Sequence, residues 1–289
     1  MSAPVLRARW LAGLAVTTTL SAILTGGSAA LAASAAKEPA LRICASTKEA
    51  PYSSGDGTGF ENRIAASLAK AMGRKAEFVF TDKYAIYLVR DSLNAGACDV
   101  VVGVDVDDER MLTTDAIYRT GYVFVSREDR QFAGTKWEDA GRPDLGRFAI
   151  RFHGPGETIL KYTGKWEDNA AYLYSLINFQ SRRNSYNNVE AARLVSEVTS
   201  GEADLAIAFA PDVARYVKAS GVPVRMQLID NDIPRPDGKI VPLHYAQAIG
   251  VRKDDASLLA EINAALPKVR ADIRRILEEE GIPLLPLGS

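Results

Sequence analysis

The chain has 289 residues, of which 47% are hydrophobic and 25% are charged, with a formal net charge of −1. This composition is that of a globular protein, and the length allows two domains of ordinary size with a core each. The lack of a basic excess argues against nucleic acid as a partner. The two histidines and two cysteines are isolated from one another in the sequence and do not form a closed zinc set, so no metal site is expected.

The first 33 residues have the pattern of a secretory signal peptide. Arg7 and Arg9 precede an apolar segment at residues 10–24, and the Ala-Leu-Ala sequence at residues 30–32 is of the kind that signal peptidase cuts. A membrane anchor is the alternative, but threonines and a serine leave the segment short of the roughly 20 apolar residues that span a bilayer. Removing two of the 35 basic residues and none of the 36 acidic ones leaves an exported, mildly acidic chain without stable membrane insertion.

Alternating strand and helix patterns follow the predicted signal. Residues 41–45 are a predicted strand, residues 60–72 a helix that ends at Gly73, and residues 76–80 the next strand. Apolar residues at positions 86, 89 and 93 predict a second helix. The uninterrupted apolar run 100–104 is typical of a strand buried on both faces. This order predicts a doubly wound parallel sheet.

The later part of the chain repeats this unit. A predicted helix around residues 195–198, a glycine, an aspartate and the strand 205–209 follow one another in the order seen before strand 100–104. Extended runs at residues 121–126 and 245–252 would form a two-stranded hinge, and a long amphipathic helix follows.

The predicted fold class is therefore α/β, with two doubly wound lobes that face each other across a cleft. Lobe 1 is predicted to take residues 38–124 and 246–289, and lobe 2 to take residues 125–245.

Cys44 lies in the first predicted strand, and Cys98 immediately precedes the strand 100–104. Export places both in an oxidising compartment, where a pair tends to close. If the two strands are neighbours in the sheet, a disulfide is the favoured interpretation. The alternative is two buried thiols that behave as small hydrophobic side chains.

Charged residues follow the strand 100–104 directly, at the edge where open α/β sheets bind ligands. The guanidinium of Arg110 can hold a carboxylate or phosphate with two parallel hydrogen bonds, and its alternative role is a surface ion pair with Asp108 or Glu109. Asp105 and Asp107 suit a cation or an amine, although the sequence lacks the glycine and distal glutamate of an EF-hand loop.

In lobe 2, the predicted strand 148–152 runs into a glycine-rich turn that begins at His153. Free N–H groups at this turn and at the helix start near Thr158 would accept an anion, but the sequence equally fits a tight turn in which Glu157 stabilises the helix. His153 is either a proton carrier near neutral pH or a structural residue.

Aromatic residues between positions 162 and 186 surround Arg182 and Arg183. Aromatic and arginine side chains are enriched at protein interfaces, although some of these aromatic residues also suit the lobe 2 core. Arg182, Arg183 and Tyr186 are therefore the predicted partner-binding residues.

No catalytic set stands out in the sequence. A nucleophile elbow, a Walker-type phosphate loop and a His-Glu-x-x-His helix are all missing. The enzymatic alternative is a buried acid, Glu61 or Glu157, whose pKa is raised by apolar surroundings.

Several stretches resemble the type II periplasmic solute-binding proteins of family 3: residues 51–53, 59–61, 98–101 and 108–110. The closer resemblance, over residues 41–285, is to the MoxJ and XoxJ proteins of bacterial methanol oxidation systems. It rests on residues 50–53, 85–91, 178–184, 214–220 and 279–283.

The resemblance implies the type II periplasmic binding protein fold and a location in the periplasm. It also implies a non-enzymatic accessory, without a cofactor of its own, of a pyrroloquinoline-quinone methanol dehydrogenase of the XoxF or MxaF type. That accessory would act in activation, assembly or cofactor handling.

In amino-acid binders of this family, the arginine that matches Arg110 grips the ligand carboxylate. Asp105 and Asp107 stand where threonines are expected, and they would repel that carboxylate. Phe209 stands where an acid would hold the ligand ammonium, and Pro155 where a threonine would bind the carboxylate. The resemblance therefore implies that the amino-acid pocket has been lost.

The predicted cleft residues are Tyr52, Phe60, Asp105, Asp107, Arg110, His153, Thr158 and Phe209. Their ligand would be a small molecule or a peptide segment. The alternative function is a solute-binding receptor of an ABC transporter for a small polar solute.

Overall fold

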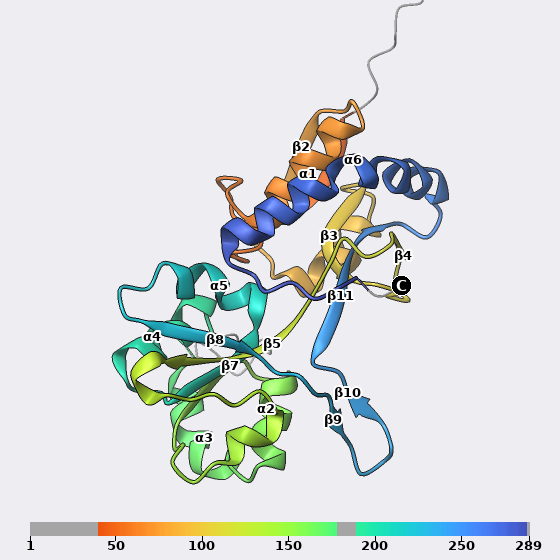
Figure 1. Ribbon diagram of the computed structural model, residues 1–289. Helices are drawn as coiled ribbons and strands as arrows, with labels where there is room; N and C mark the ends of the chain where they lie inside the picture. The colour runs from red at the N-terminus through yellow and green to blue at the C-terminus, as the bar shows by residue number, and fades with distance from the viewer. Residues whose placement is uncertain (1–39, 178–188, 288–289) are drawn as a thin grey trace, which may run out of the picture. The chain divides into compact units, whose positions relative to one another are not determined.

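The computed structural model describes residues 40–177 and 189–287 (Figure 1). The predicted signal peptide and the predicted partner-binding residues Arg182, Arg183 and Tyr186 lie outside the described residues. Among the residues that are described, no helix is long and apolar enough to cross a membrane.

The chain builds a mixed sheet with the strand order β2-β1-β3-β11-β5-β7-β6. Its first strands are β1 (Leu41–Ser46), β2 (Ala76–Thr81) and β3 (Val100–Asp105), with helix α1 (Phe60–Ala71) between β1 and β2. β1 pairs in parallel with both β2 and β3, as expected for a doubly wound unit.

Helix α1 forms where the four-residue spacing of apolar residues predicts it. Phe60, Ile64 and Leu68 are fully buried, and burial of each such side chain contributes about 1.5–3 kcal/mol. The helix is followed by Gly73 at a φ of 72°, a left-handed conformation that glycine adopts without the steric cost of a Cβ.

The segment before β3 differs from the predicted helix. A 3₁₀ turn at Ala85–Tyr87 is followed by a π-helical turn at Val89–Leu93, closed by a hydrogen bond from the Asn94 N–H to the Val89 carbonyl. Val89 and Leu93 are buried, but Ile86 is 47% exposed. The i→i+5 bond widens the turn, so the three apolar residues no longer share one face.

Two strands connect the halves of the sheet. β5 (Tyr118–Arg127) pairs with β11 (His244–Val251) through residues 118–121, and then with β7 (Leu205–Phe209) and β8 (Val224–Leu228) through residues 122–127. β11 also pairs with β3 and with the short strand β4 (Leu112–Thr113). Because these pairings are antiparallel, the sheet is mixed. It differs in this respect from the parallel sheet that the sequence pattern predicts.

The middle of the chain surrounds β6 (Phe148–Ile150) and β7, which are parallel. The helices here are α2 (Pro155–Tyr162), α3 (Trp166–Ser175), α4 (Ala191–Ser200) and α5 (Ala210–Lys218), with 3₁₀ turns at Glu128–Arg130 and Trp137–Gly141. Strands β9 (Ile233–Pro234) and β10 (Ile240–Val241) form a separate hairpin between β8 and β11 (Figure 1). Helix α6 (Ala256–Glu280) runs through Pro267 without a break and lies beside α1 (Figure 1).

Two main apolar clusters fill the molecule. The central cluster is formed by one continuous part of the chain, residues 123–243, around β5, β6 and β7. The terminal cluster combines residues 41–118 with residues 249–282 and with Ala214 of α5, and it packs α1 and α6 on the sheet. A smaller group around Cys44 and Leu93 includes buried residues of β1, β3 and β11. The lobe boundaries given above remain a prediction.

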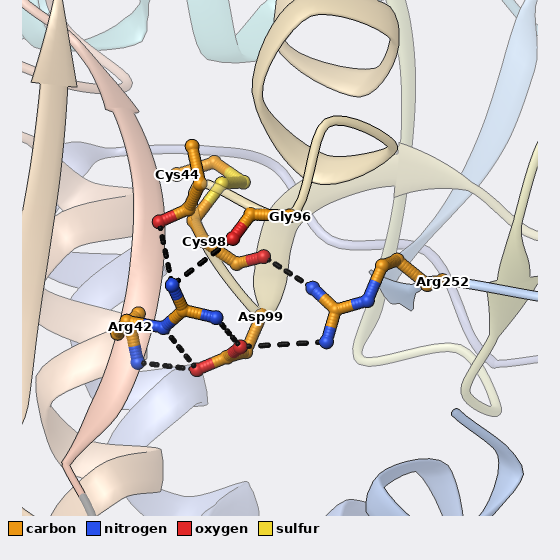
Figure 2. The surroundings of a disulfide bond; sticks show 7 residues. Arg42, Cys44, Gly96, Cys98, Asp99 and Arg252 are labelled. Carbon is orange, nitrogen blue, oxygen red and sulfur yellow. Dashed lines mark hydrogen bonds and ion pairs between the residues drawn. A yellow bond between two sulfur atoms is a disulfide. The ribbon is translucent and has the colours of Figure 1, made fainter. Parts of the chain in front are cut away.

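Cys44 and Cys98 form a disulfide (Figure 2), as the sequence favours. Their Cα atoms lie 5.3 Å apart because β1 and β3 are sheet neighbours. Beside the disulfide, the guanidinium of Arg42 donates to both Asp99 oxygens, at 3.1 and 2.6 Å. Arg252 donates to the Cys98 carbonyl at 2.5 Å, so the turn before β3 is held from two sides.

Replacing both cysteines, Cys44→Ala with Cys98→Ala, is expected to lower the free energy of unfolding by about 2–4 kcal/mol. The bond joins positions 54 residues apart, and removing it frees that loop in the unfolded chain. Equilibrium unfolding in urea measures the effect. A reductant should destabilise the native chain by a similar amount and leave the double variant unchanged; equal stability of the two chains without reductant would contradict the prediction.

Candidate functional site

A cavity of about 600 Å³ lies where the ends of several strands meet. β1 and β3 of the terminal cluster contribute residues to its wall, as do β7, the turn after β6, and the connecting strands β5 and β11. The carboxyl ends of strands are where open α/β sheets bind ligands. Of the predicted cleft residues, the cavity is lined by Tyr52, Asp105, Arg110, His153 and Phe209.

The other three predicted residues do not line this cavity. Phe60 is fully buried, and its ring centroid lies 5.0 Å from that of Tyr52, so it supports a lining residue from behind. Asp107 is exposed, at a φ of 62°, and its N–H donates to the Thr113 hydroxyl. Thr158 lies in the first part of α2, where its N–H donates to the Gly154 carbonyl.

Arg110 lines the cavity, and its guanidinium forms an ion pair with Asp108. Nε and an NH2 nitrogen donate to the two oxygens of Asp108, at 2.9 and 2.6 Å. The arginine holds the pKa of the Asp108 carboxyl below its usual range. The ion pair that the sequence offered as an alternative role is therefore present, and a ligand carboxylate that reached the remaining donors of Arg110 would lie beside the negative charge of Asp108.

Asp105 ends strand β3 at the rim of the cavity. Its Oδ1 accepts a hydrogen bond from the Gln247 side chain of β11, at 2.6 Å. An amide neutralises no charge, so Asp105 contributes a negative field to the site. A carboxylate ligand that approaches Arg110 would meet that field.

An ion pair that the sequence analysis did not single out crosses the cavity wall. Arg151, directly after β6, donates to Asp212 in the first turn of α5, at 2.8 Å. Asp212 is 5% exposed and also accepts a hydrogen bond from the Tyr52 hydroxyl. Burial raises the pKa of Asp212, against the opposing effects of Arg151 and Tyr52. Asp212 closely follows the predicted strand 205–209, but Arg151 lies within the predicted strand 148–152, and no local sequence signal marks the two as a pair.

Glu61 points its carboxylate at the backbone of Gly103, and a Cβ at that glycine would collide with it. Gly103 also has a φ of 79°, so both space and conformation favour glycine there. Burial, and then the negative charge of Glu49, raise the pKa of Glu61 well above its usual range. Among the described residues, no hydrogen-bond donor reaches the Glu61 carboxylate.

Glu157, the other acid considered for an enzyme, has a different environment. Its oxygens accept from Lys161 Nζ at 2.6 Å and from the His153 N–H at 2.8 Å. These contacts outweigh desolvation and lower the pKa of Glu157. The carboxylate thus stabilises the turn at the start of α2, the structural role that the sequence also allowed.

Three aromatic rings form one wall of the cavity. The ring centroids of Tyr122 and Phe209 lie 5.7 Å apart, and Tyr245 lies 6.2 Å from Tyr122 and 5.7 Å from Phe209. Phe209 ends β7 and is the N-cap residue of α5. Tyr122 and Tyr245 lie on the connecting strands and Phe209 at the end of β7, and their ring planes are inclined by 41° to 82°, so together they offer a ligand an apolar surface of faces and edges.

Residues 41–279 match the model of the bacterial extracellular solute-binding proteins, family 3. The chain belongs to this family. Within the family, it is 55% identical to protein MoxJ of Paracoccus denitrificans, over 85% of this chain and 89% of the relative. These matches confirm the family and the fold class that the sequence predicts.

Solved structures agree with this placement among the solute-binding proteins of family 3. The crystal structure of MxaJ from Methlophaga aminisulfidivorans MPT is 44% identical, with a TM-score of 0.80, over 85% of this chain and all (100%) of that chain. The periplasmic binding protein XoxJ from Methylobacterium extorquens AM1 is 25% identical, with a TM-score of 0.63, over 85% of this chain and 99% of that chain.

The described part of the chain offers no group of three or more His, Cys, Asp or Glu side chains arranged to hold a metal ion. The carboxylates of the cavity are instead distributed among separate partners: Asp108 with Arg110, Asp212 with Arg151, and Asp105 with Gln247. What the site can offer chemically is a negative field beside an aromatic wall.

At pH 7–8, the variant Glu61→Gln is expected to unfold at a higher temperature than the native chain. At about pH 4, the two chains are expected to unfold at similar temperatures. Between the ordinary glutamate pKa and the raised pKa in the folded chain, the folded state keeps a proton that the unfolded state releases. The free energy of unfolding therefore falls as pH rises through this window. A glutamine keeps the shape of the Glu61 side chain and removes its titratable carboxyl group. Circular dichroism melts across this pH range measure the difference.

The control is Glu109→Gln, which neutralises an exposed glutamate. Its melting temperature relative to the native chain should change little with pH. A difference between Glu61→Gln and the native chain that stays the same at every pH would show that Glu61 does not carry this proton.

Proposed function

We propose that the chain is a non-enzymatic periplasmic accessory of a methanol dehydrogenase that uses pyrroloquinoline quinone. It acts by binding the dehydrogenase during activation, assembly or cofactor handling. The 55% identity to MoxJ and the 44% identity to MxaJ support this proposal, together with the resemblance of five sequence stretches to proteins of bacterial methanol oxidation systems. Membership of an extracellular solute-binding family is consistent with a periplasmic location.

The observation that carries the proposal is the engagement of Arg110 by Asp108. In an amino-acid receptor this guanidinium would serve the ligand carboxylate, but here Nε and one terminal nitrogen donate to the two oxygens of Asp108, whose negative charge would oppose a second carboxylate at the same guanidinium. Phe209 adds an apolar ring where an acid would hold the ligand ammonium, and it packs on Tyr122 and Tyr245. Both contacts argue against uptake of amino acids and favour a protein partner.

The triple variant Arg182→Ala, Arg183→Ala, Tyr186→Ala is expected to weaken binding to the cognate dehydrogenase, of XoxF or MxaF type, at least tenfold. Arginine and tyrosine side chains commonly contribute more than 1 kcal/mol each at an interface, and about 1.4 kcal/mol is tenfold in affinity. Surface plasmon resonance with the immobilised dehydrogenase measures the dissociation constant.

A triple variant on other elements serves as the control: Arg270→Ala and Arg274→Ala on the exposed face of α6, with Phe80→Ala at an exposed aromatic residue on β2. It should bind like the native chain. Failure of the native chain to bind either type of dehydrogenase at any ionic strength would refute the proposed function.

The second candidate function is a transport receptor, and the charge of the cavity favours it for a small cation. The cavity wall holds five carboxylates, those of Glu49, Glu61, Asp105, Asp108 and Asp212, against two arginines. Both arginines lie in ion pairs with wall residues, so the five acids outnumber the positive charges of the wall. A diamine could supply further positive charge and lie against the aromatic wall.

A thermal-shift series with putrescine, calcium chloride, lysine and alanine separates the two functions. The accessory proposal expects the amino acids to leave the melting temperature unchanged, since Asp105 and Asp108 oppose a carboxylate. A receptor for an organic cation would give a shift with putrescine that is lost in Asp105→Asn; ligand at 100 times its dissociation constant stabilises by about 2.7 kcal/mol. A shift with alanine alone would contradict the loss of the amino-acid pocket.

A further inference from the structure

Two of the stretches that carry the family resemblance meet in the folded chain. One is residues 214–220 on α5, and the other is residues 279–283 at the end of α6. Arg215 donates from Nε and an NH2 nitrogen to the two oxygens of Glu280, at 2.7 and 2.8 Å. Lys218 Nζ donates to the Glu279 carbonyl at 2.6 Å. This contact lies outside the cavity described above.

Glu280 is a buried acid shared by two arginines from different elements. It is 6% exposed, and Arg63 of α1, which also forms an ion pair with Glu279, donates to its Oε1 at 3.4 Å. Arg63 and Arg215 are exposed to a similar extent, with 33% and 31% of their side-chain surface accessible. A buried carboxylate that loses a partner is costly, so both arginines are held firmly in place.

The two arginines differ in what they connect. α1 and α6 both belong to the terminal cluster, so the contact between Arg63 and Glu280 stays within one apolar core. Arg215 comes from α5, whose Val213 lies in the central cluster, and Ala214 beside it lies in the terminal cluster. Arg215 also donates to the Thr58 carbonyl in the loop before α1, at 3.1 Å. Its fork therefore joins the two clusters.

The residues after Glu280 act on the connecting strand itself. The Thr120 hydroxyl donates to the Pro283 carbonyl at 2.6 Å, and the Leu285 N–H donates to the Arg119 carbonyl at 2.8 Å. Thr120 is fully buried and lies next to the point where β5 changes partner from β11 to β7. Residues 283–285 are therefore hydrogen-bonded to β5, one of the two strands about which the clusters would rotate.

We propose that the ion pair of Glu280 with Arg215, together with the hydrogen bond from Thr120 of β5 to the Pro283 carbonyl, is a latch. This latch fixes the angle between the terminal and central clusters. Rotation about β5 and β11 would pull α5 away from α6 and leave the buried Glu280 with Arg63 alone. The cavity is then held at one width whether or not it is occupied, unlike a receptor that closes on its ligand. The latch does not depend on the proposed dehydrogenase partner.

The experiment is a pulsed electron spin resonance measurement of the distance between two spin labels on the full chain. The labels are placed at Lys75, before β2, and at Glu167, in α3, since both residues are exposed and β2 and β6, on which α3 packs, are the two ends of the strand order. The native cysteines are bonded to each other and do not take up label. The latch predicts one narrow distance distribution for the otherwise native chain.

Arg215→Gln removes the fork that joins the clusters and should at least double the width of that distribution. Arg63→Gln is the matched control, because it removes an arginine from the same carboxylate without touching the bridge; it should leave the width unchanged. Arg215→Lys keeps a charge and one donor, and it should give an intermediate width. If Arg215→Gln does not fold, the comparison of Arg215→Lys with Arg63→Gln decides.

An unchanged width in a folded Arg215→Gln chain would overturn the latch. Equal broadening in Arg63→Gln and Arg215→Gln would also overturn it, since that result would mean a general loss of stability around Glu280. A native distribution that is already broad would have the same consequence.

Discussion

Strand β5 is the element on which the arrangement of the whole molecule depends. Its first four residues pair with β11 and its last six with β7 or β8, so one continuous backbone belongs to both parts of the sheet. A strand cannot change the direction of its hydrogen bonds freely, because its N–H and C=O groups alternate along a fixed axis. β7 pairs with β5 directly and β3 is joined to β5 through β11, so the positions of the charged residues that follow β3 and β7 depend on these two connecting strands. The cavity forms where these strand ends converge.

The electrostatics of the cavity follow from how each acid is partnered. Asp108 and Asp212 lie in ion pairs with arginines, Asp105 accepts from an amide, and Glu61 is desolvated without a donor among the described residues. An acid in an ion pair stays charged and adds little net field, whereas a desolvated one tends to keep its proton. The same wall can thus be acidic in sequence and only moderately negative in charge. This moderate negative charge is more compatible with a protein-binding surface than with a site that binds both charged groups of a free amino acid.

The sequence predicts the parts of this structure that depend on local patterns. The spacing from Phe60 to Leu68 gives α1, and the run that begins at Val100 gives β3. The disulfide between Cys44 and Cys98 follows from export and from strand order. Arg110 and Phe209 are found at the cavity because strand ends gather there and because the family resemblance locates them. In each case a few neighbouring residues carry the information.

Other parts could not be predicted because they depend on distant residues. Arg151 and Asp212 form a pair only after β6 and α5 are brought together, and neither residue has a distinctive local sequence. The π turn before β3 keeps the apolar spacing of an ordinary helix, so its hydrogen bonding is not visible in the sequence. Phe60 belongs to a stretch associated with ligand binding, yet its ring is needed in the core beneath Tyr52. Sequence resemblance alone does not separate a lining residue from the one that supports it.

The division of the apolar residues between two clusters also has a consequence for the order of folding. The central cluster is built from one continuous stretch, residues 123–243, and can close as soon as that stretch is available. The terminal cluster needs Leu41 and Ile64 from one end of the chain and Ile262 and Leu277 from the other. Closing so long a loop is entropically unfavourable until the intervening chain is compact. We therefore expect the central cluster to form before the terminal cluster, whose residues 41–118 and 249–282 come together only across the intervening chain.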